Sequence, residues 1–568
     1  MFSPFFSKMQ YAKVFFLKFA FALLILSVVE LPGIQAQYLN KKLSFTRQDT
    51  LRGSVGPGRL GWDVLKYDIT VEPDFNNKTI RGKNTISFFD TGVKLMQLDL
   101  QEPMQIDSID YNNRPVSFTR DGNVFFITLR DSGARYKIKP GRNSITVYFS
   151  GTPREAVKPP WDGGWIWKKD KEGNPWMSVA CQGLGASAWY PCKDIQSDEP
   201  GEGALLNIIV PDSLVAVGNG RLIQEQTWSA GKKIYSWQVK NPINNYNIVP
   251  YIGKYVHFQE TFPGLKGKLD MDYWVLSYNL EKARKQFQDA PRMMKAFEYW
   301  FGPYPFYEDG YKLVEAPHLG MEHQGAIAYG NEFQNGYLGR DLSGSGWGKK
   351  FDFIIVHESG HEWFANNITS NDIADMWIHE GFTNYSETLF TEYYFGKEAG
   401  NDYVIGSRKN IANDIPIIGP YGVNKEGSGD MYCKAGNMLH LIRQVMKSDA
   451  KFRAMLIGLN RTFYHQTVST KQIEGYINKF SGINFSKLFD QYLRTTQVPV
   501  LELKEEGRFI SYRFSNSIDG FTIPVKLIGA AERWVKPTES WQQLKGKREN
   551  FSNLQLDKNF YITTKKLL

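Results

Sequence analysis

Apolar residues change their spacing along this 568-residue chain. After a polar lead over residues 37–59, they alternate with polar residues in short runs, the pattern of a strand with one buried face. Tyr67, Ile69 and Val71 form one such run. Similar runs occupy residues 85–89, 124–129, 144–149 and 205–210. The pattern predicts an all-β domain over residues 37–258.

From about residue 279 the apolar residues recur every three to four positions, which is the spacing of a helix with one buried face. The pattern predicts a helix over Leu280–Phe301, a break at Phe301–Pro305 and a short strand over Tyr311–Val314. A helix is expected around His357, after the apolar run Phe353–Val356, and further helices over 376–395, 434–446, 451–459, 470–480 and 485–493. We predict a mixed and then helical domain over residues 259–495.

Strand signals return at Val498–Val500, and we expect strands over 509–514, 521–528 and 560–562. About seventy residues suit a small β-sandwich, here 496–568. Charged residues are 22% of the chain and aromatic residues 15%, values typical of a globular protein. The expected fold class is therefore multidomain α+β, with an N-terminal all-β domain, an α/β and then helical domain, and a C-terminal β-sandwich.

The first 36 residues resemble a targeting signal. Three lysines precede the apolar run 19–29, and Ile34-Gln35-Ala36 offers a small residue for cleavage before Gln37. The run is short for a membrane span. We expect a cleaved signal and an exported protein, periplasmic or secreted, with no stable membrane span afterwards. An uncleaved N-terminal anchor is the alternative.

Charge and cysteine content narrow the function classes. Removal of residues 1–36 takes away three lysines and one glutamate, so the formal net charge falls from +9 to +7. The remaining basic residues are scattered, which argues against a nucleic-acid partner. Cys181, Cys192 and Cys433 are too few for a disulfide framework, although export would permit one bridge between Cys181 and Cys192. Free buried thiols are the alternative.

The segment 353–387 carries the strongest chemical signal. His357, Glu358 and His361 form H-E-x-x-H, and Glu380 follows after eighteen intervening residues. On a helix, positions i and i+4 bring both imidazoles onto one face. Two histidines and a carboxylate can hold Zn²⁺ with a fourth position for water, whose pKa the metal lowers from about 16 towards roughly 7. The alternative is an amphipathic helix with surface histidines.

Two neighbouring acids complete this reading. Glu358 is the candidate base beside the metal-activated water. Glu387 lies two turns beyond Glu380 on the same helix face, which suits a hydrogen bond to a ligand histidine. A solvated carboxylate is the alternative for Glu387. We expect one Zn²⁺ per chain.

The motif and its surroundings resemble the gluzincin aminopeptidases, the family related to aminopeptidase N and leukotriene hydrolase. The resemblance rests on H-E-x-x-H with Glu380 inside Trp377-Ile378-His379-Glu380-Gly381-Phe382, on Leu319-Gly320-Met321-Glu322-His323, and on Tyr432-Cys433-Lys434-Ala435-Gly436. It runs from about residue 60 to the C-terminus and implies a thermolysin-like catalytic domain over 259–495. Many relatives continue into a large helical domain beyond the point where this sequence stops.

The resemblance also implies roles for residues outside the zinc motif. Tyr432 would stabilise the oxyanion of the tetrahedral intermediate. Glu322 would bind the free α-ammonium of a peptide, with Gln182 as a second amine ligand and Gly320 and Met321 as further substrate-binding residues. A packed tyrosine, a surface salt bridge and a loop amide are the respective alternatives for Tyr432, Glu322 and Gln182.

The match departs from the family pattern at two positions. Leu319 stands where glycine is usual and His323 where asparagine is usual. A bulkier residue at 319 could alter the path of the substrate backbone or narrow the first side-chain pocket.

We therefore expect an exported zinc aminopeptidase that acts on peptides with a free N-terminus. A zinc metalloendopeptidase is the first alternative, against which only Glu322 and Gln182 argue. A non-catalytic peptide-binding protein of the same architecture is the second. Epoxide hydrolysis, known in one branch of the family, is disfavoured, and the absent helical domain weakens it further. The sequence sets neither the preferred N-terminal residue nor the oligomeric state.

Overall fold

The computed structural model describes residues 44–129, 140–507, 509–544 and 551–567. The predicted signal segment 1–36 lies outside these residues. Residues 47–568 form one compact unit, which begins with the short helix α3 (Arg47–Gly53). No helix within the described part of the chain is long and apolar enough to cross a membrane.

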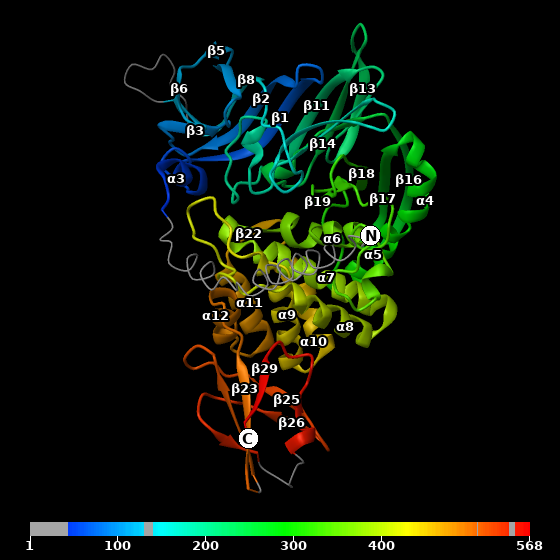
Figure 1. Ribbon diagram of the computed structural model, residues 1–568. Helices are drawn as coiled ribbons and strands as arrows, with labels where there is room; N and C mark the ends of the chain where they lie inside the picture. The colour runs from blue at the N-terminus through cyan, green and yellow to red at the C-terminus, as the bar shows by residue number, and fades with distance from the viewer. Residues whose placement is uncertain (1–43, 130–139, 508, 545–550, 568) are drawn as a thin grey trace, which may run out of the picture. The chain divides into compact units, whose positions relative to one another are not determined.

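The N-terminal region is built around a large sheet, drawn in blue to green in Figure 1. The alternation around Tyr67 produces a strand whose inward side chains, Tyr67, Ile69 and Val71, are fully buried. This strand, β1, pairs in parallel with β11 and antiparallel with β2. The sheet order is β13 (Arg221–Ser229), β14 (Lys232–Val239), β11 (Ala204–Pro211), β1 (Trp62–Asp74), β2 (Thr79–Asp90), β8 (Gly141–Gly151), β4 (Gln105–Tyr111) and β5 (Arg114–Pro115).

Two smaller sheets complete this region and share its core. The stacked Trp165 and Trp167 of one sheet pack there, and Trp189 meets Trp165 edge to face. One sheet has the order β12 (Val215–Val217), β15 (Tyr251–Gly253), β10 (Pro175–Ala180) and β9 (Gly164–Lys169); the other has β3 (Leu95–Asp99), β7 (Val124–Thr128) and β6 (Phe118–Asp121). Strand β10 ends at Ala180, two residues before Gln182. Cys181 and Cys192 are buried free thiols here, not a disulfide.

The middle region begins with a five-stranded sheet, and the expected boundary at residue 258 falls inside its first strand. The order is β16 (Tyr255–Gly264), β17 (Gly267–Leu276), β18 (Tyr311–Glu315), β20 (Ile327–Tyr329) and β19 (Gly320–Met321). Strand β19 is an edge strand that pairs only with β20. The chain that carries Glu322 therefore leaves the sheet at its open edge.

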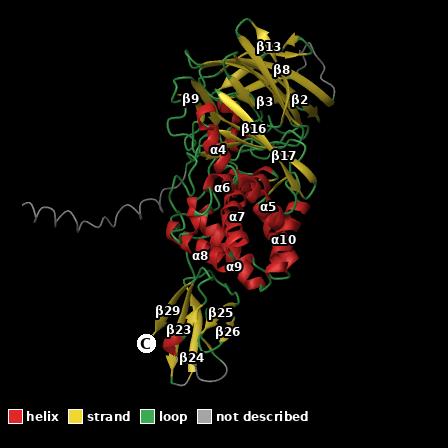
Figure 2. Ribbon diagram, turned by 90° about the vertical axis from the view of Figure 1, so that its right-hand side faces the viewer, coloured by secondary structure: helices red, strands yellow, loops and turns green. Residues whose placement is uncertain are grey.

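Helices make up most of the rest of the middle region and are coloured red in Figure 2. They are α4 (Leu280–Gln286), α5 (Asp289–Phe301), α6 (Phe353–Gly360), α7 (Trp377–Phe395), α8 (Lys397–Gly406), α9 (Cys433–Met446), α10 (Asp449–Thr462), α11 (Thr470–Ser481) and α12 (Ser486–Arg494). The predicted helix over Leu280–Phe301 was wrong in one respect, because it is two helices. Pro291 cannot donate a hydrogen bond to the carbonyl of Phe287, and its ring would clash there, so the helix breaks at Phe287 and Gln288.

Close packing of α6 against α7 positions the site. Asp352 caps the start of α6 by accepting hydrogen bonds from the amides of Ile354 and Ile355 at 3.1 and 3.3 Å. At the other end of α6 a Cβ on Gly360 would lie only 2.6 Å from Oγ of Ser386 in α7. Only glycine permits this approach. It brings the two helices close enough for their side chains to share one ion.

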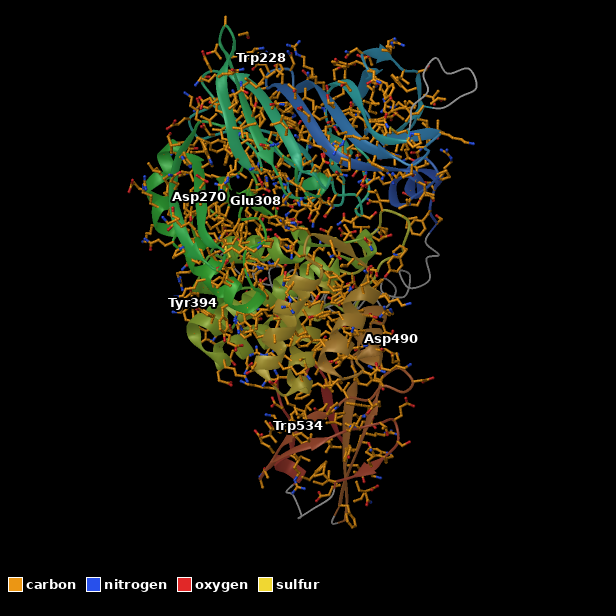
Figure 3. The ribbon with its side chains drawn as sticks, turned by 180° about the vertical axis from the view of Figure 1, so that it is seen from behind. Trp228, Asp270, Glu308, Tyr394, Asp490 and Trp534 are labelled. Atoms are coloured by element: carbon orange, nitrogen blue, oxygen red, sulfur yellow. The ribbon has the colours of Figure 1, made fainter. Side chains whose placement is uncertain are left out.

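Two small sheets close the C-terminal region, as Figure 2 shows. They have the orders β27 (Gln542–Gln543), β24 (Phe509–Ser515), β23 (Val500–Glu506), β29 (Thr563–Leu567), and β26 (Glu532–Val535), β25 (Val525–Ile528), β28 (Gln555–Leu556). Buried Leu501, Phe514 and Leu527 come from both sheets, as a sandwich requires. Figure 3 labels Trp534 in this region and Trp228 near the end of β13. The expected β-sandwich class is thus observed.

Two strand predictions in this region were wrong. Residues 521–524 are not a strand, because Phe521 turns back to the carbonyl of Ile518 and Pro524 has no amide to donate to a ladder. Residues 560–562 form turns, with the Phe560 amide bonded to the carbonyl of Asp557. Phe560 and Ile562 are buried, so they gave the alternating apolar pattern of a strand although no strand forms there.

Candidate active site

The three predicted metal ligands converge. Nε2 of His361 lies 3.4 Å from Oε2 of Glu380, and Nε2 of His357 lies 3.7 Å from the same oxygen. His357 is on α6, His361 directly follows it, and Glu380 is on α7. Although burial alone would raise the pKa of Glu380, His361 and His357 hold it below its usual range. The cluster is therefore an ionised carboxylate against two imidazoles.

The other nitrogen of each histidine is already bound. Nδ1 of His357 lies 2.7 Å from Oε1 of Glu387. Nδ1 of His361 lies 3.1 Å from the carbonyl of Phe364, where the chain turns after α6. These contacts fix both rings with Nε2 directed at Glu380, the usual orientation of metal-bound histidines. The predicted contact between Glu387 and a ligand histidine is present.

This donor set fits zinc. Bonds of about 2.0 to 2.1 Å in a tetrahedron place ligand atoms roughly 3.3 to 3.4 Å apart, close to the observed 3.4 and 3.7 Å. Oε2 of Glu380 is buried and accepts no hydrogen bond from the described residues, as expected for an atom that receives a metal. We call His357, His361 and Glu380 the metal cluster.

Glu358 lies beside the metal cluster at the bottom of the site. Burial raises its pKa to about 7, with His357 and His361 opposing the rise and Glu322 and Glu380 adding to it. A carboxylate with that pKa can accept and release a proton near neutrality. Its neighbour across the site is Gly320, where a Cβ would lie 2.6 Å from Oε1 of Glu358. Strand β19 can run this close only because residue 320 is glycine.

Glu322 is held by two residues from the N-terminal region. Its Oε1 accepts hydrogen bonds from Nε2 of Gln182 at 2.6 Å and from the hydroxyl of Tyr246 at 2.9 Å. Oε2 accepts none from the described residues. Burial raises the pKa of Glu322, and His361 opposes that rise. We call Gln182, Tyr246 and Glu322 the Glu322 cluster; a cation beside Oε2 would stabilise it.

Tyr432 stands at the start of α9 with its ring 6.1 Å from that of His357. Burial raises the pKa of its phenol well above the usual value, and Glu380 adds to the effect. The hydroxyl therefore keeps its proton and is a donor. No described residue accepts a hydrogen bond from it.

One cavity of about 710 Å³ joins these groups. Its lining includes every candidate named from the sequence: Gln182, Gly320, Met321, Glu322, His357, Glu358, His361, Glu380, Glu387 and Tyr432. Leu319 also lines it, whereas His323 does not; His323 is buried and bonded to the hydroxyl of Tyr251. Of the two departures from the family motif, only Leu319 lines the cavity.

Two tyrosines of the site were missed. Tyr246 lies in a turn at 245–247, and Tyr403 of α8 donates to Oε2 of Glu387 at 2.7 Å. Thirty tyrosines occur in the chain, and neither of these two is at motif spacing. No sequence signal distinguished them, because their roles arise from packing between distant segments.

Comparison with known proteins agrees with this geometry. Residues 286–492 match the peptidase family M1 domain. The chain is 21% identical to leukotriene A-4 hydrolase of Xenopus laevis over 84% of this chain and 76% of that protein. It is also 21% identical to probable aminopeptidase 2 of Sulfurisphaera tokodaii, over 79% of this chain and 55% of that protein.

Solved structures share the fold. The M1 zinc metallopeptidase of Deinococcus radiodurans, in a mutant form, has a TM-score of 0.65 at 19% identity, covering 78% of this chain and 97% of that one. The same mutant bound to a Tyr-Ser-Ala substrate has a TM-score of 0.64 at 20% identity, with the same coverage. Together with the metal cluster, these matches identify the chain as a protein with a peptidase M1 domain, homologous to leukotriene A-4 hydrolase and to aminopeptidases.

Proposed function

We propose that this chain is a zinc-dependent aminopeptidase that removes the N-terminal residue from peptides. The observation that carries the proposal is the Glu322 cluster in the same cavity as the metal cluster. A zinc ion held by His357, His361 and Glu380 would polarise the scissile carbonyl and lower the pKa of water to roughly 7. The remaining steps belong to side chains of this chain.

Glu358 is the general base and then the general acid. Its pKa of about 7 allows it to take a proton from the attacking water at neutral pH. It then passes that proton to the nitrogen of the leaving amine as the peptide bond breaks. Gly320 packs against Glu358, so strand β19 lies directly beside this carboxylate.

Tyr432 stabilises the oxyanion. Its protonated hydroxyl has no partner among the described residues, so it is available to donate a hydrogen bond to the carbonyl oxygen as negative charge develops. Stacking of its ring towards His357 orients it at the same end of the cavity as the metal cluster.

The Glu322 cluster selects the N-terminus. Oε2 of Glu322 accepts a charge-assisted hydrogen bond from the α-ammonium, while Gln182 and Tyr246 hold Oε1 in place. An internal residue or an acetylated N-terminus presents no cation there. The open edge of β19 offers the backbone of Gly320 and Met321 to the substrate as an added strand.

The test compares free-amine aminoacyl fluorogenic substrates with their N-acetylated twins, with and without a zinc chelator. We expect cleavage of the free amines alone and its loss with the chelator. Cleavage of the acetylated twins would instead favour a metalloendopeptidase. A zinc-loaded protein that binds peptides tightly and cleaves neither set would be a peptide-binding protein.

Two further parts of the proposal rest on the sequence. Residues 1–36 support export, to be checked by N-terminal sequencing of the mature protein, with Gln37 as the expected first residue. Both groups of potential metal ligands among the described residues contain His361, which supports one Zn²⁺ per chain, to be checked by metal analysis. A chain that keeps Met1 would favour the N-terminal anchor.

A further inference from the structure

One wall of the cavity contributes only Gln182 to the proposed reaction. Residues 424–426, in the segment before Tyr432, face residues 182–184, and both segments line the cavity. Asn424 donates a hydrogen bond from Nδ2 to the carbonyl of Gly183 at 2.7 Å, which fixes one segment against the other. We call residues 182–184 and 424–426 the Glu426 wall.

Glu426 places an unpartnered carboxylate on this wall. Its Oε1 lies 3.5 Å from the position that a Cβ on Gly183 would occupy, so it is in contact with that glycine. It forms no hydrogen bond or ion pair with any described residue. Burial raises its pKa, Glu380 adds to the rise and the exposed neighbour Lys425 opposes it. A half-buried carboxylate without a partner is an unsatisfied charge that a cation would stabilise.

The Glu426 wall adjoins the Glu322 cluster. Gly183 follows Gln182 directly in the chain, and Gln182 is bonded to Glu322. A residue whose α-ammonium is held by Glu322 therefore lies next to this wall. Because residue 183 has no side chain, nothing from that position separates the side chain of the bound residue from Oε1 of Glu426.

The neighbouring lining suits a long side chain with a charged end. Trp161, whose surface is 71% exposed, lines the cavity together with Pro160 and Leu184. These apolar groups can cover the methylene stem of lysine or arginine, and an indole face also attracts cations. A carboxylate and apolar groups in the lining of one cavity match the two halves of such a side chain.

We propose that Glu426 makes this enzyme selective for peptides that begin with arginine or lysine, by pairing with the cationic end of the first side chain. The inference rests on the proposed aminopeptidase function and names its substrate class. Glu426 acts on binding of the substrate and takes no part in proton transfer.

The test measures kcat/KM for arginyl, lysyl, leucyl and glutamyl fluorogenic substrates. The natural chain is expected to prefer arginine and lysine over leucine. Glu426→Gln, which keeps the shape and removes the charge, is expected to lower arginyl and lysyl turnover by at least about tenfold. Leucyl turnover is expected to stay within about twofold, because no ion pair is lost there. Glu426→Lys is expected to reverse the preference in favour of the glutamyl substrate.

Glu308→Gln is the matched control. Glu308 is exposed, does not line the cavity and is labelled in Figure 3. Glu308→Gln removes one negative charge away from the site, as Glu426→Gln does within it. It is therefore expected to leave kcat/KM unchanged for all four substrates. A general effect of net charge on cationic substrates would appear in this variant as well.

Three outcomes would overturn the inference. Equal losses for all four substrates in Glu426→Gln would make Glu426 part of the α-ammonium site. Unchanged values would show that Glu426 does not contact the first side chain. Calorimetric binding of argininamide and leucinamide separates this inference from the proposed reaction. If the natural chain cleaves no substrate but binds argininamide, and Glu426→Gln loses that binding, the proposed reaction is refuted and the role of Glu426 is supported. Equal binding of both amides by both proteins would refute the role of Glu426.

Discussion

The metal cluster and the Glu322 cluster lie in one cavity but are assembled in opposite ways. The metal cluster comes from residues 357–380, which run from α6 through the connecting segment 361–376 into α7. The Glu322 cluster joins the N-terminal region to an edge strand across 140 positions between Gln182 and Glu322. The first is local chemistry and the second depends on how two regions pack. A change to one should therefore leave the other intact.

Glu358→Gln is expected to have the largest effect of the variants that separate the two clusters. Loss of the base should lower kcat by about 10³-fold or more, because the other described carboxylates beside the metal cluster already have another role in the proposal. Metal analysis should find zinc retained, since Glu358 is not a ligand. An empty site in this variant would contradict the role and make Glu358 structural. Glu308→Gln serves as the control.

Glu322→Ala should disrupt the Glu322 cluster and leave the metal cluster intact. Free-amine substrates should lose about 100-fold in kcat/KM, about 3 kcal/mol, because a buried charged contact disappears. Zinc content should be unchanged. Steady-state kinetics at saturating zinc measures the effect, and full activity would remove Glu322 from the mechanism.

Glu387→Gln sharpens the comparison by acting only on the metal cluster. Its hydrogen bond orients His357, so zinc affinity should fall by about 10- to 100-fold. Competition with a chelating dye measures this affinity directly. Selectivity between free and acetylated amines should be unchanged, and a change in selectivity would show that the two clusters are coupled.

Tyr246→Phe is the smallest change and acts only on the Glu322 cluster. It removes one hydrogen bond to Oε1 while Gln182 remains, so kcat/KM should fall by about tenfold. Tyr235→Phe, a conservative change in β14 away from the cavity, is the control. Equal losses in both variants would mean that Tyr246 acts through stability alone.

The same contrast explains what could be predicted from the sequence. The ligand spacing around His357 and the helices near it were predictable, because helical geometry converts local spacing into position. The fold class was predictable from the change of period near residue 279. Pro291 could have warned of the break between α4 and α5, and it was overlooked in favour of periodicity.

Other features required three-dimensional packing. Tyr246, Tyr403 and Glu426 are at no motif spacing, and each acquires its place through contact with a distant segment. Phe560 and Ile562 show the reverse error, because alternating buried residues also occur in turns that cover a core. Gln182 and Glu322 were named from the family resemblance; their hydrogen bond could not have been read from spacing.

The Glu322 cluster has a consequence at the scale of a mixture of peptides. For a site that binds an α-ammonium, the substrate concentration is the concentration of free N-termini and not the mass of peptide. A long protein and a dipeptide each offer it one substrate. Every internal cut made by another protease creates a new end and adds a substrate without adding material. If the proposed reaction is correct, the concentration of substrate for this enzyme is therefore set by earlier endoproteolysis.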